Sequence, residues 1–299
     1  MGTKKQTETL ISQACTTVPG FATTWKELER KIVLDGNSNS TLTAYGRSIA
    51  QVALHFNKDP LLLKDEQVNE YLYQLNRNGK NSESYYKFAV YGLRYLYRVF
   101  GQEDKAIALP PLRKKSTLPT VLSKEECRKL FSAPRLLKHR VLLAFIYSAG
   151  LRMNEARTLR IEDIDSDRMQ IHVRQGKGRK DRYVVLSNYI LQGLRKYYIS
   201  YQPKIYLFNG TKPGEPLGKR SLQWIVSEAA KKTSIRKEVN VHTLRHSFAT
   251  HLLEDGVDLY TIKEQLGHER IETTLTYLHI AKTTRQLAHS PLDTLYGKK

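Results

Sequence analysis

Apolar residues recur at helical spacing through the first hundred residues of the chain. In one such stretch Val68, Leu72 and Leu75 lie three or four positions apart, which is the spacing of one face of a helix. The stretches DGNSNS and NRNGKNS interrupt the pattern with residues that favour turns. The pattern therefore predicts four helices, over Thr24–Leu34, Ser40–Phe56, Asp65–Leu75 and Ser82–Phe100.

The helical pattern ends in IALPPLRKKSTLPTVLS, which is rich in proline and lysine and has no periodicity. Such a composition is typical of a linker between domains. We expect the boundary near Lys115, with a helical domain over residues 1–112 and a second domain over residues 113–299. Ser123 and Glu126 match the capping-box pattern, which predicts that a helix begins directly after the linker.

The second segment combines helical and strand patterns. The apolar runs MQIHV and RYVVL flank the turn QGKGRKD, an arrangement that predicts a β-hairpin. Helices are predicted over Lys124–Phe131, Leu136–Ser148, Arg152–Leu159, Tyr189–Tyr198, Arg220–Lys232, His242–Leu253, Leu259–Leu266 and Ile271–Ile280. The predicted fold class is mostly α with a small antiparallel β-sheet, with α+β architecture in the second domain.

The net charge of the chain narrows the choice of partner. Lys and Arg number 49 against 29 Asp and Glu, which leaves a charge of +20 and a pI near 9.8. This surplus favours a polyanion, because each phosphate that a cation neutralises releases a bound counterion. We favour nucleic acid as the partner; a solvated basic surface and an anionic membrane are the alternatives.

The apolar runs and the cysteines indicate the cellular compartment of the protein. The longest apolar run, from Val141, is about half of the ~20 residues that a membrane span needs. The N-terminus, MGTKKQTETL, has no apolar signal core. Cys15 and Cys127 have no metal or redox spacing. We therefore expect a cytoplasmic protein without disulfides and without a membrane partner.

The stretch HTLRHSFATH raises the question of a metal site. Histidines four apart on a helix are a zinc arrangement when a Glu follows the first His, but His242 is followed by Thr243. Arg245 lies one turn away, and a guanidinium binds phosphate oxygens rather than metals. We predict an anion site and no metal, and we interpret His246 and His251 as structural residues.

Five separated motifs follow one another in the second segment. They are GLRMNEA with Arg152, GKG with Lys177, HTLR with His242 and Arg245, LGH with His268, and TTLTY ending at Tyr277. In this order they resemble the tyrosine recombinase, or phage integrase, family, and are similar to the bacterial Xer-type and the integron and transposon integrases. The resemblance covers nearly the whole chain.

The resemblance implies both a fold and a function. The fold is an N-terminal SAM-like helical core-binding domain followed by a C-terminal tyrosine recombinase catalytic domain. The function is that of a site-specific DNA recombinase or integrase, which cleaves and rejoins DNA through a 3′-phosphotyrosyl intermediate and a Holliday junction.

The residue types suit this chemistry. A covalent link between Tyr277 and the DNA keeps the energy of the broken bond, so that resealing needs no ATP. Arg152 and Arg245 are candidates to hold the negative charge that develops on the phosphate oxygens. Position selects Tyr277 among 18 tyrosines. The nearby Tyr260 we interpret as a core residue.

The remaining roles come from the resemblance. It makes Lys177 the general acid that protonates the departing 5′ oxygen, with Lys180 in the same turn as the alternative acid or a phosphate contact. His242 assists proton transfer from the tyrosine, and His268 donates a hydrogen bond to the scissile phosphate. Glu155 is a supporting carboxylate, or alternatively a helix-surface residue.

Basic residues in the aromatic helix, the linker and the hairpin are the candidate DNA contacts. The stretch YYKFAVYGLRYLYRVF is also consistent with a core helix whose cations lie on its outer face. The DNA-binding candidates are Lys87, Arg94, Arg113, Lys114, Lys115, Arg179, Lys180 and Arg182.

By resemblance the partners are double-stranded DNA recombination sites and further copies of the chain. Four protomers assemble on two sites and exchange their C-terminal tails. We expect action at the nucleoid, without a cofactor or a metal.

Three alternatives remain from the sequence. A type IB topoisomerase or telomere resolvase forms the same phosphotyrosine, but the compact N-terminal domain argues against both. A non-catalytic DNA-binding accessory factor has no need for Tyr277. A metal-dependent nuclease needs a carboxylate cluster near the HxxR motif, and none is present in the sequence there.

Overall fold

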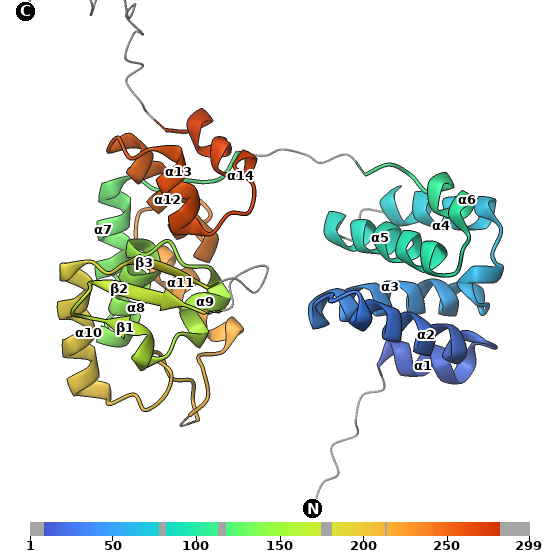
Figure 1. Ribbon diagram of the computed structural model, residues 1–299, viewed down its shortest axis with the longest axis horizontal. Coiled ribbons are helices and arrows are strands. Elements are labelled where there is room, and N and C mark those ends of the chain that lie inside the picture. Colours follow the sequence, from blue (N-terminus) through green and yellow to red (C-terminus); the bar gives the residue numbers. More distant parts are fainter. Residues whose placement is uncertain (1–8, 78–81, 113–117, 175–180, 213, 282–299) are drawn as a thin grey trace, which may run out of the picture. The chain divides into compact units, whose positions relative to one another are not determined.

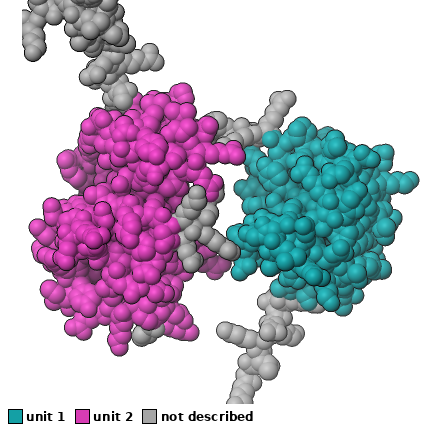
Figure 2. Space-filling model, in the orientation of Figure 1, with its two compact units in different colours: residues 1–115 teal, residues 116–299 magenta. Residues whose placement is uncertain are grey.

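A computed structural model of the chain describes residues 9–77, 82–112, 118–174, 181–212 and 214–281. The chain forms two compact units, residues 1–115 and 116–299 (Figure 2). None of the helices in the described ranges combines the length and the hydropathy that crossing a bilayer requires.

The first unit is built from helices around one apolar core. Its elements are α1 (Leu10–Thr17), α2 (Phe21–Leu34), α3 (Asn39–Phe56), the 3-10 helix η1 (Pro60–Leu62), α4 (Asp65–Arg77), α5 (Glu83–Val99) and α6 (Glu103–Ala108) (Figure 1). Helices α3 and α5 pack against each other, and Ile49, Leu93 and Leu96 are fully buried. Ser38 and Ser82 cap these two helices by accepting backbone N–H bonds, as is usual for serine at that position.

All four helices predicted for this region are confirmed, but α1 and α6 were not predicted. Helix α1 has eight residues and buries only Ala14, and α6 has six residues and buries only Ala106. Helices this short carry fewer than three turns of apolar pattern, so they give little periodic signal. Helix α6 also runs into the start of the stretch interpreted as a linker.

The second unit is an α+β unit. Its helices are α7 (Lys124–Ser132), α8 (Leu137–Ser148), α9 (Met153–Thr158), η2 (Ile161–Asp163), α10 (Asn188–Tyr201), α11 (Lys219–Lys231), α12 (Val241–Glu254), α13 (Leu259–Leu266), α14 (Glu272–Leu275) and η3 (Thr276–His279). Helix α8 packs against α7, α10 and α12. Its stretch VLLAFI is buried at every position but one, because it is covered on several sides. The capping box of Ser123 and Glu126 is confirmed at the start of α7.

A three-stranded antiparallel sheet completes the second unit. Strands β1 (Ile164–Asp165), β2 (Gln170–Val173) and β3 (Arg182–Val185) pair in the order β1-β2-β3 (Figure 1). The predicted hairpin is confirmed as β2 and β3, whose register pairs Val173 with Arg182 at the end next to the turn. Strand β1 has two residues and no alternation that a sequence pattern could reveal. The mostly α fold class with a small antiparallel sheet is confirmed.

Gly150 connects α8 to the start of α9 in a conformation that other residues adopt with strain. Its φ is +56°, and a Cβ added there would lie 2.5 Å from the Phe248 ring and 3.0 Å from Leu266. Its carbonyl oxygen accepts a hydrogen bond from Arg245. The turn therefore requires a glycine for two reasons. Its φ is positive, and Phe248 of α12 and Leu266 of α13 leave no room for a Cβ.

Gly150→Ala is expected to lower the free energy of unfolding of the second unit by about 2–4 kcal/mol. The cost of a left-handed backbone conformation and the cost of overpacking against Phe248 both contribute. Gly256→Ala is the matched control, because its φ is +85° with nothing within 4 Å, and we expect about 1–2 kcal/mol there. Urea unfolding followed by Trp224 fluorescence, in a Trp25→Phe background that leaves one tryptophan, measures both. Equal losses for the two variants would contradict the crowding at Gly150.

Candidate active site

Arg152 and Glu155 form the base of the site, at the start of α9. Glu155 is buried, and its carboxylate accepts from the backbone N–H of Arg152 and from Nη1 of the same residue, both at 2.8 Å. Arg152 is the residue that caps the helix, and the Glu155 carboxylate lies in the first turn, where the helix dipole favours a negative charge. Arg152 Nη2 donates to the Gly267 carbonyl oxygen at 2.7 Å.

Arg245 projects from α12 into the same place. It is 3% exposed, and its two terminal nitrogens donate to the carbonyl oxygens of Gly150 and Leu266 at 2.6 Å each. Nη1 also lies 4.0 Å from a Glu155 oxygen. Burial, and then the positive charge of Arg152, lowers the pKa of Arg245 to about 9, which leaves this guanidinium charged at neutral pH.

Arg182 brings a third guanidinium to Glu155. From the first position of β3 it donates through Nη1 and Nη2 to the two carboxylate oxygens at 2.8 Å each, and through Nε to the Gln265 carbonyl oxygen. Its side chain is 11% exposed. The sequence suggested a DNA contact for Arg182, but in the structure its guanidinium pairs with the buried Glu155 carboxylate.

One carboxylate thus organises three arginines. Burial alone would raise the pKa of Glu155, but hydrogen bonds and charge from Arg182, followed by bonds from Arg152, lower it to about 2. Glu155 is therefore ionised whenever the protein is near neutral pH. Its ion pairs contribute stability that is complete above its ordinary pKa near 4.5 and is lost as the pH falls toward 2.

Gly267 closes the site next to Arg182. It ends α13 with φ +61°, and a Cβ added there would lie 2.9 Å from Cδ of Arg182. Its carbonyl oxygen is the one that Arg152 holds. The glycine of the LGH motif therefore lets two arginines approach the same short segment of backbone.

Tyr277 lies on η3 and directs its hydroxyl at α12. The side chain is buried, and its hydroxyl oxygen lies 3.1 Å from Nδ1 of His246. The ring of His268 stacks at 6.4 Å from the Tyr277 ring, and its Nδ1 lies 3.0 Å from the Thr274 hydroxyl. With Thr274 as the donor, the ring proton of His268 lies on Nε2, where it can be donated to a ligand.

Burial sets the protonation states around Tyr277. It raises the pKa of the Tyr277 phenol, although Arg245 and Arg152 act in the opposite direction. Burial and then Arg245 lower the pKa of His268 to about 3 and that of His242 below its usual value. At neutral pH the site therefore combines charged guanidiniums with a neutral phenol and neutral imidazoles.

Arg152, Arg245 and Tyr277 line one pocket of about 700 Å³. It is lined by Pro119, Arg152, His242, Arg245, His246, Gly267, His268, Glu269, Arg270, Thr273, Thr276 and Tyr277. All predicted catalytic residues among the described ones line it, together with Arg270, which the sequence analysis did not select. Arginines beside a neutral phenol suit binding of an anionic phosphodiester and attack on its phosphorus.

Two side chains lie in surroundings that the sequence did not indicate. His246, interpreted as structural, lies 3.1 Å from the Tyr277 hydroxyl, and its spacing of four from His242 places both histidines on one face of α12. Tyr260 was interpreted as a core residue, but it is 67% exposed, because the buried side of α13 carries Ile262 and Leu266. His251 lies 2.8 Å from the Tyr147 hydroxyl, as a structural role requires.

Several predicted residues fall outside the described ranges. Those in the hairpin turn and the linker are Lys177, Arg179, Lys180, Arg113, Lys114 and Lys115. The strand ends that flank the turn are described. Arg174, just after β2, pairs with Asp163, and Arg182 at the start of β3 pairs with Glu155.

Lys87 and Arg94, on α5, are described within the first unit. Lys87 forms an ion pair with Glu83. Arg94 donates to the carbonyl oxygens of Ala106, Leu109 and Pro110, which fixes the end of α6 and the residues after it. These contacts give Arg94 a structural role that does not depend on DNA.

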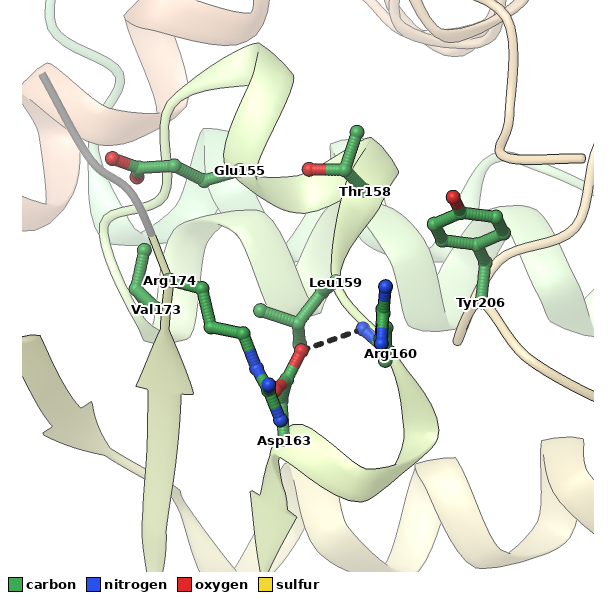
Figure 3. A pocket seen from close by; sticks show the side chains of 8 residues that line it. All are labelled: Glu155, Thr158, Leu159, Arg160, Asp163, Val173, Arg174 and Tyr206. Atoms are coloured by element: carbon green, nitrogen blue, oxygen red, sulfur yellow. Dashed lines mark hydrogen bonds and ion pairs between the residues drawn. The ribbon is translucent and has the colours of Figure 1, made fainter. Parts of the chain in front are cut away.

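A second pocket, of about 450 Å³, lies on the other side of Glu155. It is lined by Glu155, Thr158, Leu159, Arg160, Asp163, Val173, Arg174 and Tyr206 (Figure 3). In Figure 3 the Arg174 side chain points toward Asp163, and Asp163 also accepts from the Arg160 backbone. Its two arginines pair with two carboxylates, Glu162 and Asp163. At the first pocket Arg152 and Arg245 share the single carboxylate of Glu155, so the first pocket is the more favourable one for an anion. In the described part of the chain, no three His, Cys, Asp or Glu side chains are grouped to hold a metal ion.

Comparisons with known proteins identify the family of the chain. Residues 120–284 match the model of the phage integrase family. The integrase/recombinase y4qK of Sinorhizobium fredii is 38% identical over 86% of this chain and 84% of its own length. Tyrosine recombinase XerA of Thermococcus kodakarensis is 33% identical over 85% and 90%. The crystal structure of XerH site-specific recombinase bound to difH has a similar fold, with a TM-score of 0.64 at 22% identity over 91% and 90%.

Arg182→Met is expected to destabilise the second unit by about 3–5 kcal/mol, since it leaves the buried Glu155 carboxylate with fewer cationic partners. Arg128→Met is the control, because Arg128 is 75% exposed in its pair with Glu125, and exposed pairs contribute about 0–1 kcal/mol. Urea unfolding and DNA-binding titrations are measured on both. Unchanged stability combined with weaker DNA binding would restore the DNA-contact interpretation of Arg182.

Proposed function

The chain belongs to the phage integrase family and is a tyrosine-type site-specific recombinase, and on that premise we propose that Tyr277 is the nucleophile that breaks and rejoins the DNA strand. One observation carries the proposal. The Tyr277 side chain lines the same pocket as Arg152 and Arg245. A phosphodiester held by those two guanidiniums therefore lies within the pocket that the phenol lines.

The two arginines bind the phosphate and stabilise the transition state. Attack by Tyr277 adds negative charge to the non-bridging oxygens, and charged donors fixed in advance stabilise that charge without reorganising. Loss of one such donor typically costs about 3 kcal/mol. Glu155 supports the clamp, because its ion pair with Arg152 and its 4.0 Å approach to Arg245 fix both guanidiniums.

The leaving 5′ oxygen takes a proton from Lys177 in this proposal. The alkoxide is a poor leaving group unless it is protonated, and a positioned acid contributes about 10²–10⁴-fold to such a step. Two ion pairs hold the strand ends on either side of the turn that carries Lys177, Arg174–Asp163 and Arg182–Glu155. These ion pairs fix the described residues on both sides of the turn.

The two predicted catalytic histidines have different proposed tasks. His268 donates from Nε2 to the phosphate, which agrees with its bond to Thr274 at Nδ1. His242 lines the pocket with Arg152 and Arg245, and in this proposal it donates a hydrogen bond to the bound phosphate. Both are neutral near pH 7, so they act as hydrogen-bonding groups beside the charged arginines.

The proposed substrate is duplex DNA carrying a recombination site, and the chain's surplus of 20 positive charges suits it. We propose a tetramer on two such sites, with exchange of the C-terminal tails, acting at the nucleoid. Residues 282–299 of that tail lie outside the described ranges. Family membership disfavours a topoisomerase, a telomere resolvase and a non-catalytic accessory factor.

Tyr277→Phe is expected to abolish the covalent protein–DNA adduct while DNA binding persists, since only the hydroxyl is removed. A nicked duplex bearing the recombination site traps the adduct at the 3′ end, and denaturing gels detect it. DNA binding by the same variant, measured by gel shift, is the control. An adduct of wild-type yield in Tyr277→Phe would falsify the nucleophile assignment.

Lys177→Ala is expected to slow cleavage by about 10²–10⁴-fold and to recover on a substrate whose 5′ bridging oxygen is replaced by sulfur. A thiolate leaves without protonation, so the loss of a general acid no longer matters. Arg245→Ala is the comparison, because a clamp defect should persist on the sulfur substrate. If Lys177→Ala stays slow there while Lys180→Ala recovers, the acid is Lys180.

A further inference from the structure

Tyr277 must lose its phenolic proton as it attacks, and the structure presents one immediate acceptor. Its hydroxyl oxygen lies 3.1 Å from Nδ1 of His246, within hydrogen-bonding distance. His242 is on the same face of α12 one turn earlier, with its ring centroid 6.3 Å from that of His246. Among the described side chains, His246 is the one that hydrogen-bonds the Tyr277 hydroxyl.

We propose that His246 is a catalytic residue that accepts the phenolic proton of Tyr277 during cleavage and returns it during rejoining. The inference rests on the proposed nucleophile. It differs from the role that the family resemblance gives to His242, because it assigns the proton to the imidazole that touches the reacting oxygen.

The proton balance of the step is complete. Before attack, His246 carries its ring proton on Nε2, and Nδ1 accepts the hydrogen bond of the phenol. As Tyr277 Oη bonds to phosphorus, the phenolic proton passes to Nδ1, and the phosphorus–O5′ bond breaks as Lys177 protonates the leaving oxygen. Rejoining reverses both transfers, and the imidazolium gives its proton back to the phenol.

The surroundings of His246 keep its ring neutral, and therefore able to accept a proton, but they also make it a weak base in the empty pocket. It faces His242 and Arg245 from its own helix, Tyr277 from η3 and His268 from the segment after α13. Burial, and then His242 and Arg245, lower the pKa of His246 to about 4, so the ring is neutral near pH 7. A phosphodiester in the pocket adds a negative charge beside these cations, which stabilises the imidazolium when it forms.

The test separates proton acceptance from positioning by changing the nucleophile as well as the histidine. Single-turnover cleavage of a nicked substrate is measured for His246→Ala and His246→Asn, each with tyrosine or trifluorotyrosine at position 277. Asn offers an oxygen acceptor for the hydroxyl but cannot take up a proton. Trifluorotyrosine has a much lower phenol pKa and needs no base.

Both His246 variants are expected to cleave about 10²–10⁴-fold more slowly with ordinary tyrosine and to recover most of the rate with trifluorotyrosine. His242→Ala is the comparison, and its defect should persist with trifluorotyrosine. Gel-shift binding of the same nicked DNA confirms that each variant is folded. If His246→Ala fails to fold, His246→Asn still tests the proposal.

Three outcomes would overturn the inference. One is wild-type cleavage by His246→Ala, and another is wild-type cleavage by His246→Asn, which would reduce His246 to a positioning group. The third is recovery with trifluorotyrosine in His242→Ala but not in the His246 variants. Failure of the nucleophile assignment itself is distinguishable, because Tyr277→Phe would then still form the adduct.

Discussion

The site depends on a single buried carboxylate that keeps positive charges together. Guanidiniums repel one another, and three of them at one point in a protein interior need a fixed negative charge to remain there. Glu155 provides it, with ion pairs to Arg152 and Arg182 and a 4.0 Å approach to Arg245. Backbone carbonyl oxygens that follow α8 and end α13 accept three further N–H groups, from Arg152 and Arg245. The result is a set of cations that is in place before any phosphate arrives.

Around that cationic centre, burial keeps the other groups neutral. Burial, and then neighbouring positive charge, lowers the pKa values of His242, His246 and His268, while burial raises the pKa of Tyr277. The positive charge of the pocket is thus concentrated on arginines, which do not act as proton donors or acceptors. Proton transfer is left to the histidines, to Tyr277 and to the lysine proposed on the hairpin turn.

Much of this could be predicted from the sequence, and the failures have physical causes. The long helices and the β-hairpin were predicted because their apolar residues repeat over several turns or alternate along a strand. Four of the motifs identified Arg152, Arg245, His268 and Tyr277, and the fold brings all four residues to one pocket. The role of Arg182 could not be predicted, because its ion pair joins β3 to a residue in α9 and no local pattern encodes such a contact. The contact between His246 and Tyr277 could not be predicted, because only the fold brings η3 to α12.

The contact between Gly267 and Arg182 links two motifs that are distant in the sequence. A side chain at Gly267 would displace the Arg182 stem, and displacing that stem would loosen the carboxylate that holds the other arginines. Substitutions at Gly267 and Arg182 are therefore coupled, and we expect the two residues to change together or not at all. Directed evolution toward new DNA targets is better aimed at the surfaces that meet DNA, with this pair excluded from the randomised positions.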